Sequence, residues 1–268
     1  MVTTMETLKV IKIGGNVVDH PEKLQQFLRD FATLEGHKVL VHGGGKVATA
    51  IARGLGIEAQ MIDGRRVTDA EMLRIVTMVY AGLINKNIVA ALQEGGCNAL
   101  GLCGADGGLV RSKRRPVTAK GIDYGFVGDP TDFNLDTAAT LIEGGLVPVV
   151  APITFDADSE TGGGLLNTNA DTVAQAVAVG LAKRYAVELV YCFEKRGVLR
   201  DVEDDNSVIS GIDPALYERL KADGVVADGM LPKLDNAFTA IRSGVKSVVI
   251  CSAERLTLPG YGGTTLTL

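Results

Sequence analysis

The sequence has few of the residues that build metal centres and disulfide scaffolds. Its three histidines, His20, His37 and His42, are too few for a histidine-rich metal site. Its four cysteines form no C-x-x-C pair and are too sparse for a disulfide framework, which favours buried, reduced thiols. We therefore expect no metal site built from protein side chains.

Long runs of one residue class are also missing. No apolar stretch approaches the roughly 18 residues of a membrane span, and the polar N-terminal segment is too short for a secretory signal. The formal net charge is -5 without a long basic run, and we interpret Lys113-Arg114-Arg115 as a solvated hairpin. These absences argue against nucleic-acid and membrane partners and predict a cytoplasmic protein with small-molecule substrates.

The chain instead alternates short β-branched runs with helical stretches from end to end. With 268 residues, 46% of them hydrophobic, this predicts an α/β fold with a largely parallel sheet covered by helices on both faces. We expect irregular hairpins over residues 104–128 and a lobe boundary at the glycine-rich break 161–164. Helices are expected near 21–34, 46–55, 69–92, 136–143, 172–181, 213–221 and 231–243. Strands are expected near 10–13, 39–42, 99–102, 146–150, 188–192, 247–251 and 264–267.

One strand near the N-terminus carries a lysine. The run Val10-Ile11-Lys12-Ile13 stops at Gly14-Gly15, where backbone amides can approach a ligand closely. In a phosphoryl-transfer enzyme, Lys12 would neutralise charge on the transferred group while the two glycine amides supply fixed dipoles. Taken alone, the stretch fits a tight turn and a solvated lysine equally well.

A second glycine loop follows the next strand. Gly43-Gly44-Gly45 leads directly into a helix, so it lies at a helix N-terminus, where free amides and the helix dipole attract anions. Its spacing fits neither a Walker A motif nor a dinucleotide-binding fingerprint. Because both loops end strands of one sheet, they can converge on one site.

An arginine follows a predicted hairpin. Residues 59–67 should turn near Asp63-Gly64, and Thr68-Asp69-Ala70-Glu71 reads as a capping box that starts a helix. Arg66 would then lie beside that helix N-terminus. There it could clamp a carboxylate, or it could be an ordinary surface residue.

Two further polar clusters lie in the C-terminal part. Asn167, Asn169 and Asp171 alternate before a helix; one of them can be its N-cap, but three exceed what a cap requires. Asp171 is suited to hold cationic side chains in position rather than to act as a base. Lys233 follows Pro232 at the start of another helix, which aims a second ammonium at a helix N-terminal site.

In their order and spacing these motifs resemble the amino acid kinase family. The resemblance extends over essentially the whole chain and points, within the family, to the branch that phosphorylates N-acetylglutamate in arginine biosynthesis. Each motif alone is weak, and their ordered combination is specific. The matching segments are Lys12-x-Gly14-Gly15, His42-Gly43-Gly44-Gly45, Gly64-x-Arg66-Val67-Thr68, Gly125-Phe126-Val127-Gly128, Asn167-x-Asn169-Ala170-Asp171, Asp228-Gly229-Met230-x-Pro232-Lys233 and Gly263-Thr264.

The resemblance implies an enzyme that transfers a phosphoryl group from ATP directly to the γ-carboxylate of an N-acyl-L-glutamate. It implies a three-layer α/β/α sandwich around an open, mainly parallel sheet of about eight strands. Residues 1–165 would form the lobe that binds the acyl amino acid and makes the dimer, and residues 166–268 the ATP-binding lobe. Magnesium would be carried mainly by the nucleotide phosphates, without a named protein ligand.

The resemblance also implies three groups of site residues. Lys12 and Lys233 would stabilise the transferred phosphoryl group, with Asp171 organising both lysines. No general base is needed, because the acceptor carboxylate is already ionised at neutral pH. The substrate-binding residues would be Gly44, Gly45, Arg66, Asn167 and Asn169. The ATP-binding residues would be Gly14, Gly15, Glu194, Gly197, Val198, Val225, Val226 and Met230.

Two segments depart from the family pattern. Where the family usually has Thr-Asp-Val-x-Gly-Val, this chain has Phe193-Glu194-Lys195-Arg196-Gly197-Val198, which leaves the adenosine contacts open. Residues 125–133 carry additional Asp and Pro beside the expected acyl pocket. The acyl group is therefore acetyl, or a larger dicarboxylic group such as succinyl, for which Arg65 or the cluster 113–115 would supply a cation. Because few residues precede the first strand, we also expect an arginine-insensitive homodimer.

Two alternatives stay open. The chain could be another kinase of this family, acting on aspartate, free glutamate, carbamate or a nucleotide, or a non-catalytic amino-acid or nucleotide sensor. Arg66 together with Asn167 and Asn169 favours an acylated amino acid. The set Lys12, Asp171 and Lys233 argues against the sensor, because a sensor does not need both transition-state cations.

Overall fold

An open, mostly parallel sheet forms the centre of the molecule. The computed structural model describes residues 5–157, 164–226 and 230–268. Neighbouring strands run parallel except for one antiparallel pair, formed by residues 248–250 and 264–266. Within the described residues, the spatial order of the eight strands is β12 (Gly211–Ile212), β14 (Thr264–Leu266), β13 (Ser247–Ser252), β11 (Ala186–Phe193), β1 (Thr7–Ile13), β2 (His37–His42), β8 (Val147–Val150) and β5 (Ala99–Leu102).

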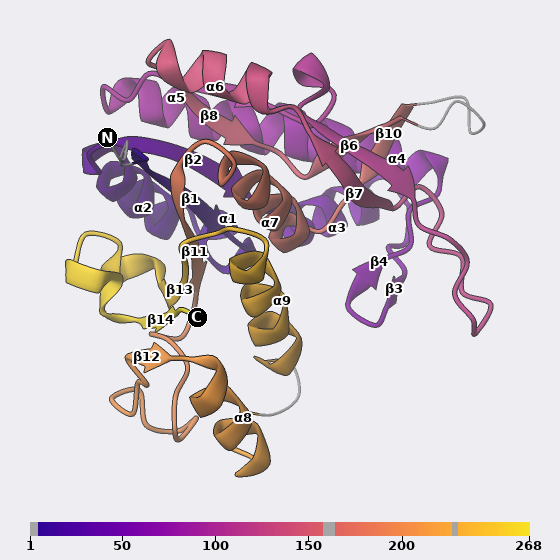
Figure 1. Ribbon diagram of the computed structural model, residues 1–268. Coiled ribbons are helices and arrows are strands. Elements are labelled where there is room, and N and C mark those ends of the chain that lie inside the picture. The colour runs from indigo at the N-terminus through magenta and orange to yellow at the C-terminus, as the bar shows by residue number, and fades with distance from the viewer. Residues whose placement is uncertain (1–4, 158–163, 227–229) are drawn as a thin grey trace.

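Helices cover both faces of this sheet (Figure 1). Side chains alternate along a strand, so Leu8 and Val10 of β1 enter one buried apolar cluster while Ile11 and Ile13 enter the other. The predicted three-layer sandwich is thereby confirmed. The Ile11 face is covered by α1 (Gly15–Val18), α2 (Pro21–Thr33), α3 (Gly45–Gly54), α4 (Ala70–Thr77) and α5 (Asn85–Glu94). The Val10 face is covered by α6 (Leu135–Glu143), α7 (Ala170–Leu181), α8 (Pro214–Ala222) and α9 (Met230–Arg242).

The topology directs the loops after the central strands to one edge. β1 lies between β2, which follows it in the chain, and β11, which comes much later. Parallel strands end at the same edge, and a reversal of strand order at that edge is where open α/β sheets bind ligands. The glycines after β1 and β2 therefore meet at the sheet's binding edge.

A second sheet extends from this edge and corrects one expectation. Residues 104–128 were expected to form irregular hairpins; part of this segment instead belongs to regular strands. The expectation is wrong because the strand within this segment, Val110–Arg114, is rich in charged residues and so resembles a loop. Its antiparallel partner contains Pro130, and a register shift beside Ser112 accommodates the proline. Within the described residues, the sheet has the order β10 (Gly164–Asn167), β9 (Ile153–Asp156), β6 (Val110–Arg114) and β7 (Gly128–Phe133). The predicted break at 161–164 lies outside the described residues except for Gly164.

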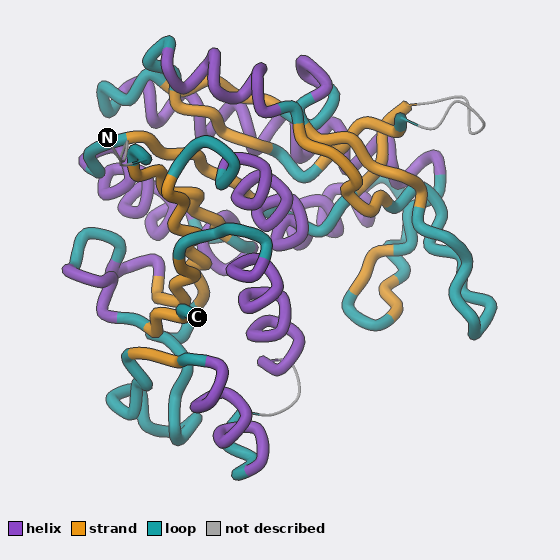
Figure 2. Tube along the Cα trace, viewed as in Figure 1, coloured by secondary structure: helices purple, strands orange, loops and turns teal. Residues whose placement is uncertain are grey.

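The expected helix at 69–92 is present, with two differences. Met78–Ile84 is π-helical between α4 and α5, a geometry that often marks functional sites. The predicted capping box is wrong: Asp69, not Thr68, caps α4, and its carboxylate accepts a hydrogen bond from the Met72 amide. Asp69 caps the helix because the Thr68 hydroxyl donates to the Arg66 carbonyl instead. The hairpin of β3 (Met61–Ile62) and β4 (Arg65–Arg66) precedes this helix and projects from the body (Figure 2).

The same helical stretch contradicts the expectation that no apolar run approaches membrane-spanning length. Residues Ala70–Glu94 form 25 helical residues, and an 18-residue window within them has a mean hydropathy of 1.5, long and apolar enough by that measure. One side of the stretch, including Met72, Val76 and Ile88, is buried in the core on the Ile11 face. Buried core helices of globular proteins share this composition.

Candidate active site

Strand alternation turns Lys12 toward α7. Lys12 shares the face of Leu8 and Val10, and only 6% of its surface is exposed. Its ammonium lies 2.7 Å from Oδ1 of Asp171, in the first turn of α7. Burying a lysine is unfavourable unless an anion compensates the charge, so this ion pair explains how Lys12 is kept at the sheet edge. The family resemblance implies that Asp171 organises both Lys12 and Lys233, and the ion pair joins it to Lys12.

The two glycine loops need glycine for space and for backbone conformation. Gly44 has φ +150°, and a Cβ there would lie 2.2 Å from Cδ1 of Ile84 in the π-helical segment. A Cβ at Gly14 would approach the Lys12 ammonium to 3.1 Å. α1 begins at Gly15 and α3 at Gly45, so two helix N-termini with free amides open at this edge.

His42 anchors the second glycine loop from behind. Its Nδ1 lies 2.9 Å from the Gly43 carbonyl, which can only accept, so Nδ1 carries the proton. Nε2 then accepts a hydrogen bond from Nδ2 of Asn85 at 3.1 Å, and the same amide donates to the Val149 carbonyl. Complete burial lowers the pKa of His42 to about 4, which keeps the ring neutral. His42 is thus a structural support of the loop.

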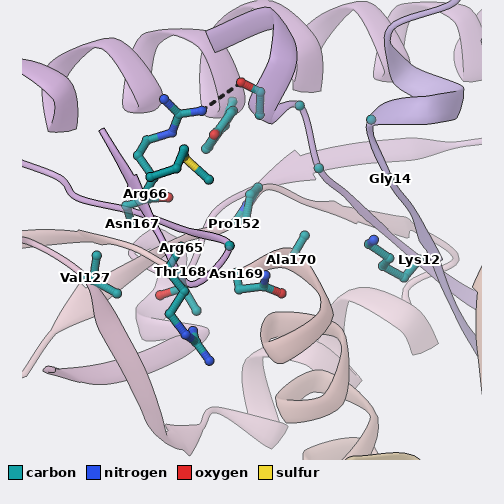
Figure 3. A pocket seen from close by; sticks show the side chains of 17 residues that line it. Lys12, Gly14, Arg65, Arg66, Val127, Pro152, Asn167, Thr168, Asn169 and Ala170 are labelled. Carbon is teal, nitrogen blue, oxygen red and sulfur yellow. Dashed lines mark hydrogen bonds between the residues drawn. The ribbon is translucent and has the colours of Figure 1, made fainter. Parts of the chain in front are cut away.

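Arg66 reaches the second glycine loop from the β3–β4 hairpin. Asp63 and Gly64 turn the hairpin with positive φ, as the sequence predicts. The buried Arg66 guanidinium donates from Nη2 to the Gly45 carbonyl at 2.9 Å (Figure 3). The same Nη2 donates to the Thr49 hydroxyl at 2.7 Å. Arg66 is therefore held at the start of α3 and is not a surface residue.

The three alternating polar residues have three different surroundings. Asn167, at the end of β10, is 8% exposed and donates to the Thr68 hydroxyl at 3.0 Å. Asn169 is the N-cap of α7: its Oδ1 accepts from the amides of Asp171 and Thr172. Asp171 pairs with Lys12. The Asn169 oxygen is used in capping, which leaves its amide group to face the cavity.

These parts line one cavity, the glycine-loop cavity (Figure 3). Sequence reasoning did not assign Tyr80, Pro152 or Thr168 to the site. Tyr80 belongs to the π-helical segment, and burial raises its pKa. No local sequence pattern indicates that Tyr80, Pro152 or Thr168 belongs to the site. Val127, which also lines the cavity, lies within one of the family motifs. The lining is Lys12, Gly14, Gly15, Gly43, Gly44, Gly45, Met61, Gly64, Arg65, Arg66, Tyr80, Val127, Pro152, Asn167, Thr168, Asn169 and Ala170.

Lys233 lies beside this cavity, in the first turn of α9. It lines an adjoining cavity, the lysine cavity, together with Asp171, Gln175, Tyr191, Phe193, Asn236 and Ile250. Its ammonium lies over the Phe193 ring, 4.0 Å from the ring centroid, and the Lys12 ammonium lies 5.4 Å from the same centroid. Both lysines and Asp171 thus gather around one aromatic ring. Asp228 and Gly229 of the Lys233 motif lie outside the described residues.

The residues predicted to bind ATP fall into separate places. Gly14 and Gly15 line the glycine-loop cavity, and Glu194 lines a third cavity with Phe193, Lys23 and Ser252. The role predicted for the set stays a prediction. The rest belong to the C-terminal part: Gly197 packs against Thr264, Val198 and Val226 are buried, and Val225 and Met230 pack against the core.

The described parts define a class of α/β protein built to handle phosphate groups at a sheet edge. Comparison with known proteins identifies the family: its model, described as the amino acid kinase family, matches residues 7–252. The chain belongs to the amino acid kinase family.

Individual relatives agree with this assignment. An acetylglutamate kinase of Cytophaga hutchinsonii is 60% identical over 252 residues, covering 94% of this chain and 94% of that protein. An acetylglutamate kinase of Parabacteroides distasonis is 54% identical over 252 residues, covering 94% and 96%. The solved N-acetylglutamate synthase of Neisseria gonorrhoeae, with coenzyme A and N-acetyl-glutamate bound, superimposes with a TM-score of 0.78 at 20% identity. It covers 98% of this chain and 59% of that chain, a likeness of fold alone.

The predicted family, its fold and the prediction of an enzyme of the kinase class are confirmed. So is the resemblance to the acetylglutamate kinases, whose name both relatives bear. Membership of a kinase family implies the use of ATP.

Proposed function

We propose that this chain transfers the γ-phosphoryl group of ATP to the γ-carboxylate of an N-acyl-L-glutamate, giving the acyl phosphate in arginine biosynthesis. The observation that carries the proposal is the grouping of Lys12, Asp171 and Lys233 beside a cavity lined by two glycine loops and Arg66. The names of the relatives, 54% and 60% identical, support the acyl amino acid as acceptor.

The proposed chemistry is direct in-line transfer. The acceptor γ-carboxylate oxygen forms a bond to the γ-phosphorus while the bond to the bridging oxygen of ADP breaks. Lys12 and Lys233 would neutralise charge on the transferred group, and the amides of the glycine loops would add fixed dipoles. Asp171 would hold Lys12 in position. The acceptor is ionised at neutral pH, so no side chain needs to remove a proton.

Magnesium would enter with the nucleotide. In the described part of the chain, no three His, Cys, Asp or Glu side chains lie close enough together to hold a metal ion. A magnesium ion bound to ATP phosphates needs only one or two protein oxygens, or none. We therefore assign no protein ligand to it.

The acyl amino acid would lie in the glycine-loop cavity. Arg66 would bind its α-carboxylate, since a guanidinium presents paired donors to a carboxylate. Asn167 and Asn169 would donate hydrogen bonds to its acylamino group, and the amides of Gly44 and Gly45 would contact the carboxylate that receives the phosphoryl group. Each of these residues lines the cavity, which supports the assignment.

Arg65 bears on the identity of the acyl group. Its half-buried side chain lines the cavity, and Figure 3 shows it directed away from Arg66. Burial, and then the charge of Arg115, lower the pKa of Arg65. Within the described residues the Arg65 guanidinium makes no hydrogen bond or ion pair, while Arg115 pairs with Asp129, whose charge also acts to raise the pKa of Arg65. A dicarboxylic acyl group such as succinyl would bring Arg65 an anion of its own; with acetyl, Arg65 would share the charge of Asp129 with Arg115.

An acyl phosphate assay tests both the proposed reaction and the identity of the acyl group. N-acetyl-L-glutamate and N-succinyl-L-glutamate are compared side by side with ATP, and the product is trapped with hydroxylamine. If the substrate is dicarboxylic, Arg65→Gln reduces kcat/KM for the succinyl compound by about 10-fold or more and leaves the acetyl compound unaffected. Arg111→Gln, an exposed arginine of β6, is the matched control. If the enzyme prefers N-acetyl-L-glutamate and Arg65→Gln does not change that preference, the acyl group is acetyl. If neither compound is phosphorylated, the proposed function is wrong.

We further propose two lobes, residues 1–165 for the acyl amino acid and 166–268 for ATP, and a cytoplasmic homodimer. Met78 and Leu83 of the π-helical segment are 57% and 48% exposed, large apolar side chains that a dimer interface would cover. Gel filtration should give a mass near two subunits, and a mass near six would contradict the dimer. Assays with added arginine should show no inhibition.

A further inference from the structure

Phe193 has no role in the site described so far, yet it contacts the charges proposed to drive the reaction. It occupies the position at which the family motif usually has threonine, and it is the last residue of β11. Its side chain lies between the lysine cavity and the third cavity that contains Glu194.

The position of the ring follows from the register of the sheet. Lys12 of β1 is paired with Tyr191 of β11, and Phe193 follows two residues later, so all three point to the face covered by α7 and α9. The rings of Tyr191 and Phe193 stack, with centroids 5.9 Å apart and an interplanar angle of 11°. The Tyr191 hydroxyl donates to the Asp171 carbonyl at 3.3 Å. The stack is thereby fixed to both β11 and α7.

The two ammonium groups differ in what else holds them. Lys12 has the Asp171 carboxylate at 2.7 Å, and its 5.4 Å distance to the Phe193 centroid is secondary. The Lys233 ammonium makes no ion pair or hydrogen bond with any described residue, and it lies 4.0 Å from the centroid of the Phe193 ring. An ammonium over a ring face within about 6 Å is attracted by the ring's quadrupole. The Phe193 ring therefore attracts the Lys233 ammonium and holds it in place, as the Asp171 carboxylate does for the Lys12 ammonium.

We infer that Phe193 is a positioning residue that holds the Lys233 ammonium on its ring face, at a fixed place beside Lys12, before the nucleotide binds. The inference rests on the proposed phosphoryl transfer for its kinetic consequence. Lys233 hangs from a flexible four-carbon stem at the start of α9, so without the ring it must be ordered again in each catalytic cycle. A ring that orders it in advance lowers the free energy needed to reach the transition state.

Kinetics of three variants test the inference. Phe193→Leu keeps apolar bulk but removes the ring, whereas Phe193→Tyr keeps the ring face. We expect Phe193→Leu to lower kcat by about 3- to 30-fold with a smaller change in KM for ATP, and Phe193→Tyr to retain most of kcat. A Phe193→Leu variant that raises KM for ATP with kcat unchanged would overturn the inference, since the ring would then be a nucleotide contact.

Fluorination of the ring separates electrostatics from packing. Stepwise fluorination of Phe193 weakens the ring quadrupole with little change in size, so log kcat should fall with each fluorine while the thermal midpoint stays constant. Phe31 is the matched control, because the Lys38 ammonium lies 5.1 Å from its centroid in the core, away from the site. Fluorinating Phe31 should leave kcat unchanged. A flat series at Phe193 would refute the electrostatic role even if Phe193→Leu fails to fold.

An NMR signal makes the test independent of enzymatic activity. With lysine labelled at Cε, the Lys233 methylene protons should be shifted upfield by the ring current, and Lys233→Ala identifies the signal. Phe193→Leu should abolish the shift, and Phe193→Tyr should preserve it. If the shift is present but no acyl glutamate is phosphorylated, the proposed function fails and the placement of Lys233 stands. If the shift is absent in the unmodified protein, the inference itself is wrong.

Discussion

Replacing His42 should change how the stability of the protein depends on pH. The ring is fully buried between the Gly43 carbonyl and Asn85, and burial lowers its pKa from 6.5 to about 4. Between pH 4 and pH 6.5, His42 therefore binds a proton in the unfolded chain but not in the folded chain. Stability rises with pH wherever the unfolded state holds more protons. The stability that the buried neutral His42 ring contributes is fully present above pH 6.5 and is lost as the pH falls toward 4.

The size of the effect follows from the shift. A difference of about 2.5 pKa units corresponds to roughly 3 kcal/mol. The assay is urea unfolding of the wild type and of His42→Gln at intervals between pH 4 and pH 6.5. The free energy of unfolding of the wild type should fall relative to that of His42→Gln by about that amount across the interval. The exposed His20→Gln is the control and should follow the wild type.

Parallel curves for the wild type and His42→Gln would refute this reasoning. They would mean that the imidazole accepts a proton in the folded state, so that its bond to the Asn85 amide is not maintained. Nδ1–H could still donate to the Gly43 carbonyl, but a protonated Nε2 cannot accept from the Asn85 amide, so the ring that supports the second glycine loop would not be held from both sides as described.

Three further substitutions test the site. Gly44→Ala places a Cβ 2.2 Å from Ile84 and should destabilise the protein by about 1–3 kcal/mol in thermal unfolding, while Gly82→Ala, with nothing within 4 Å, should not. Arg66→Lys loses the paired donors and should raise KM for the acyl glutamate about 10- to 100-fold; an unchanged KM would remove Arg66 from the substrate site. Asp171→Asn releases Lys12 and should lower kcat about 10²-fold in steady-state assays, and equal kcat values would contradict its positioning role.

The elements that the sequence predicts well are those whose pattern is local. The alternation of apolar residues along β1 and the glycines after β1 and β2 define the binding edge, because parallel strands with buried faces leave few alternatives. The position of Asp171 at a helix start predicts a side chain that holds cations, and the family resemblance names Lys12 as one of them. The same local chemistry predicts an N-cap among Asn167, Asn169 and Asp171, and the structure shows that it is Asn169.

The remaining features depend on contacts between distant segments. The second sheet joins residues 110–133 to residues 153–167, and its charged, proline-containing strands resemble loops in the sequence. The capping box failed because Thr68 is used by Arg66 and Asn167, a partner 99 residues away. The position of Phe193 under Lys233 requires both the β1–β11 register and the placement of α9. None of these contacts leaves a periodic trace in the sequence.

The most direct test of the proposed function is Lys12→Gln with turnover and nucleotide affinity measured on the same preparation. Acyl phosphate formation is followed by hydroxylamine trapping and ATP affinity by calorimetry. Because Lys12 is proposed to act on charge that develops during transfer, turnover should fall by about 10²- to 10³-fold while ATP affinity changes far less. Equal losses in both would make Lys12 a nucleotide anchor, and unchanged turnover would contradict the proposed mechanism. A wild-type protein that binds ATP but forms no acyl phosphate from an acyl glutamate would contradict the proposed function.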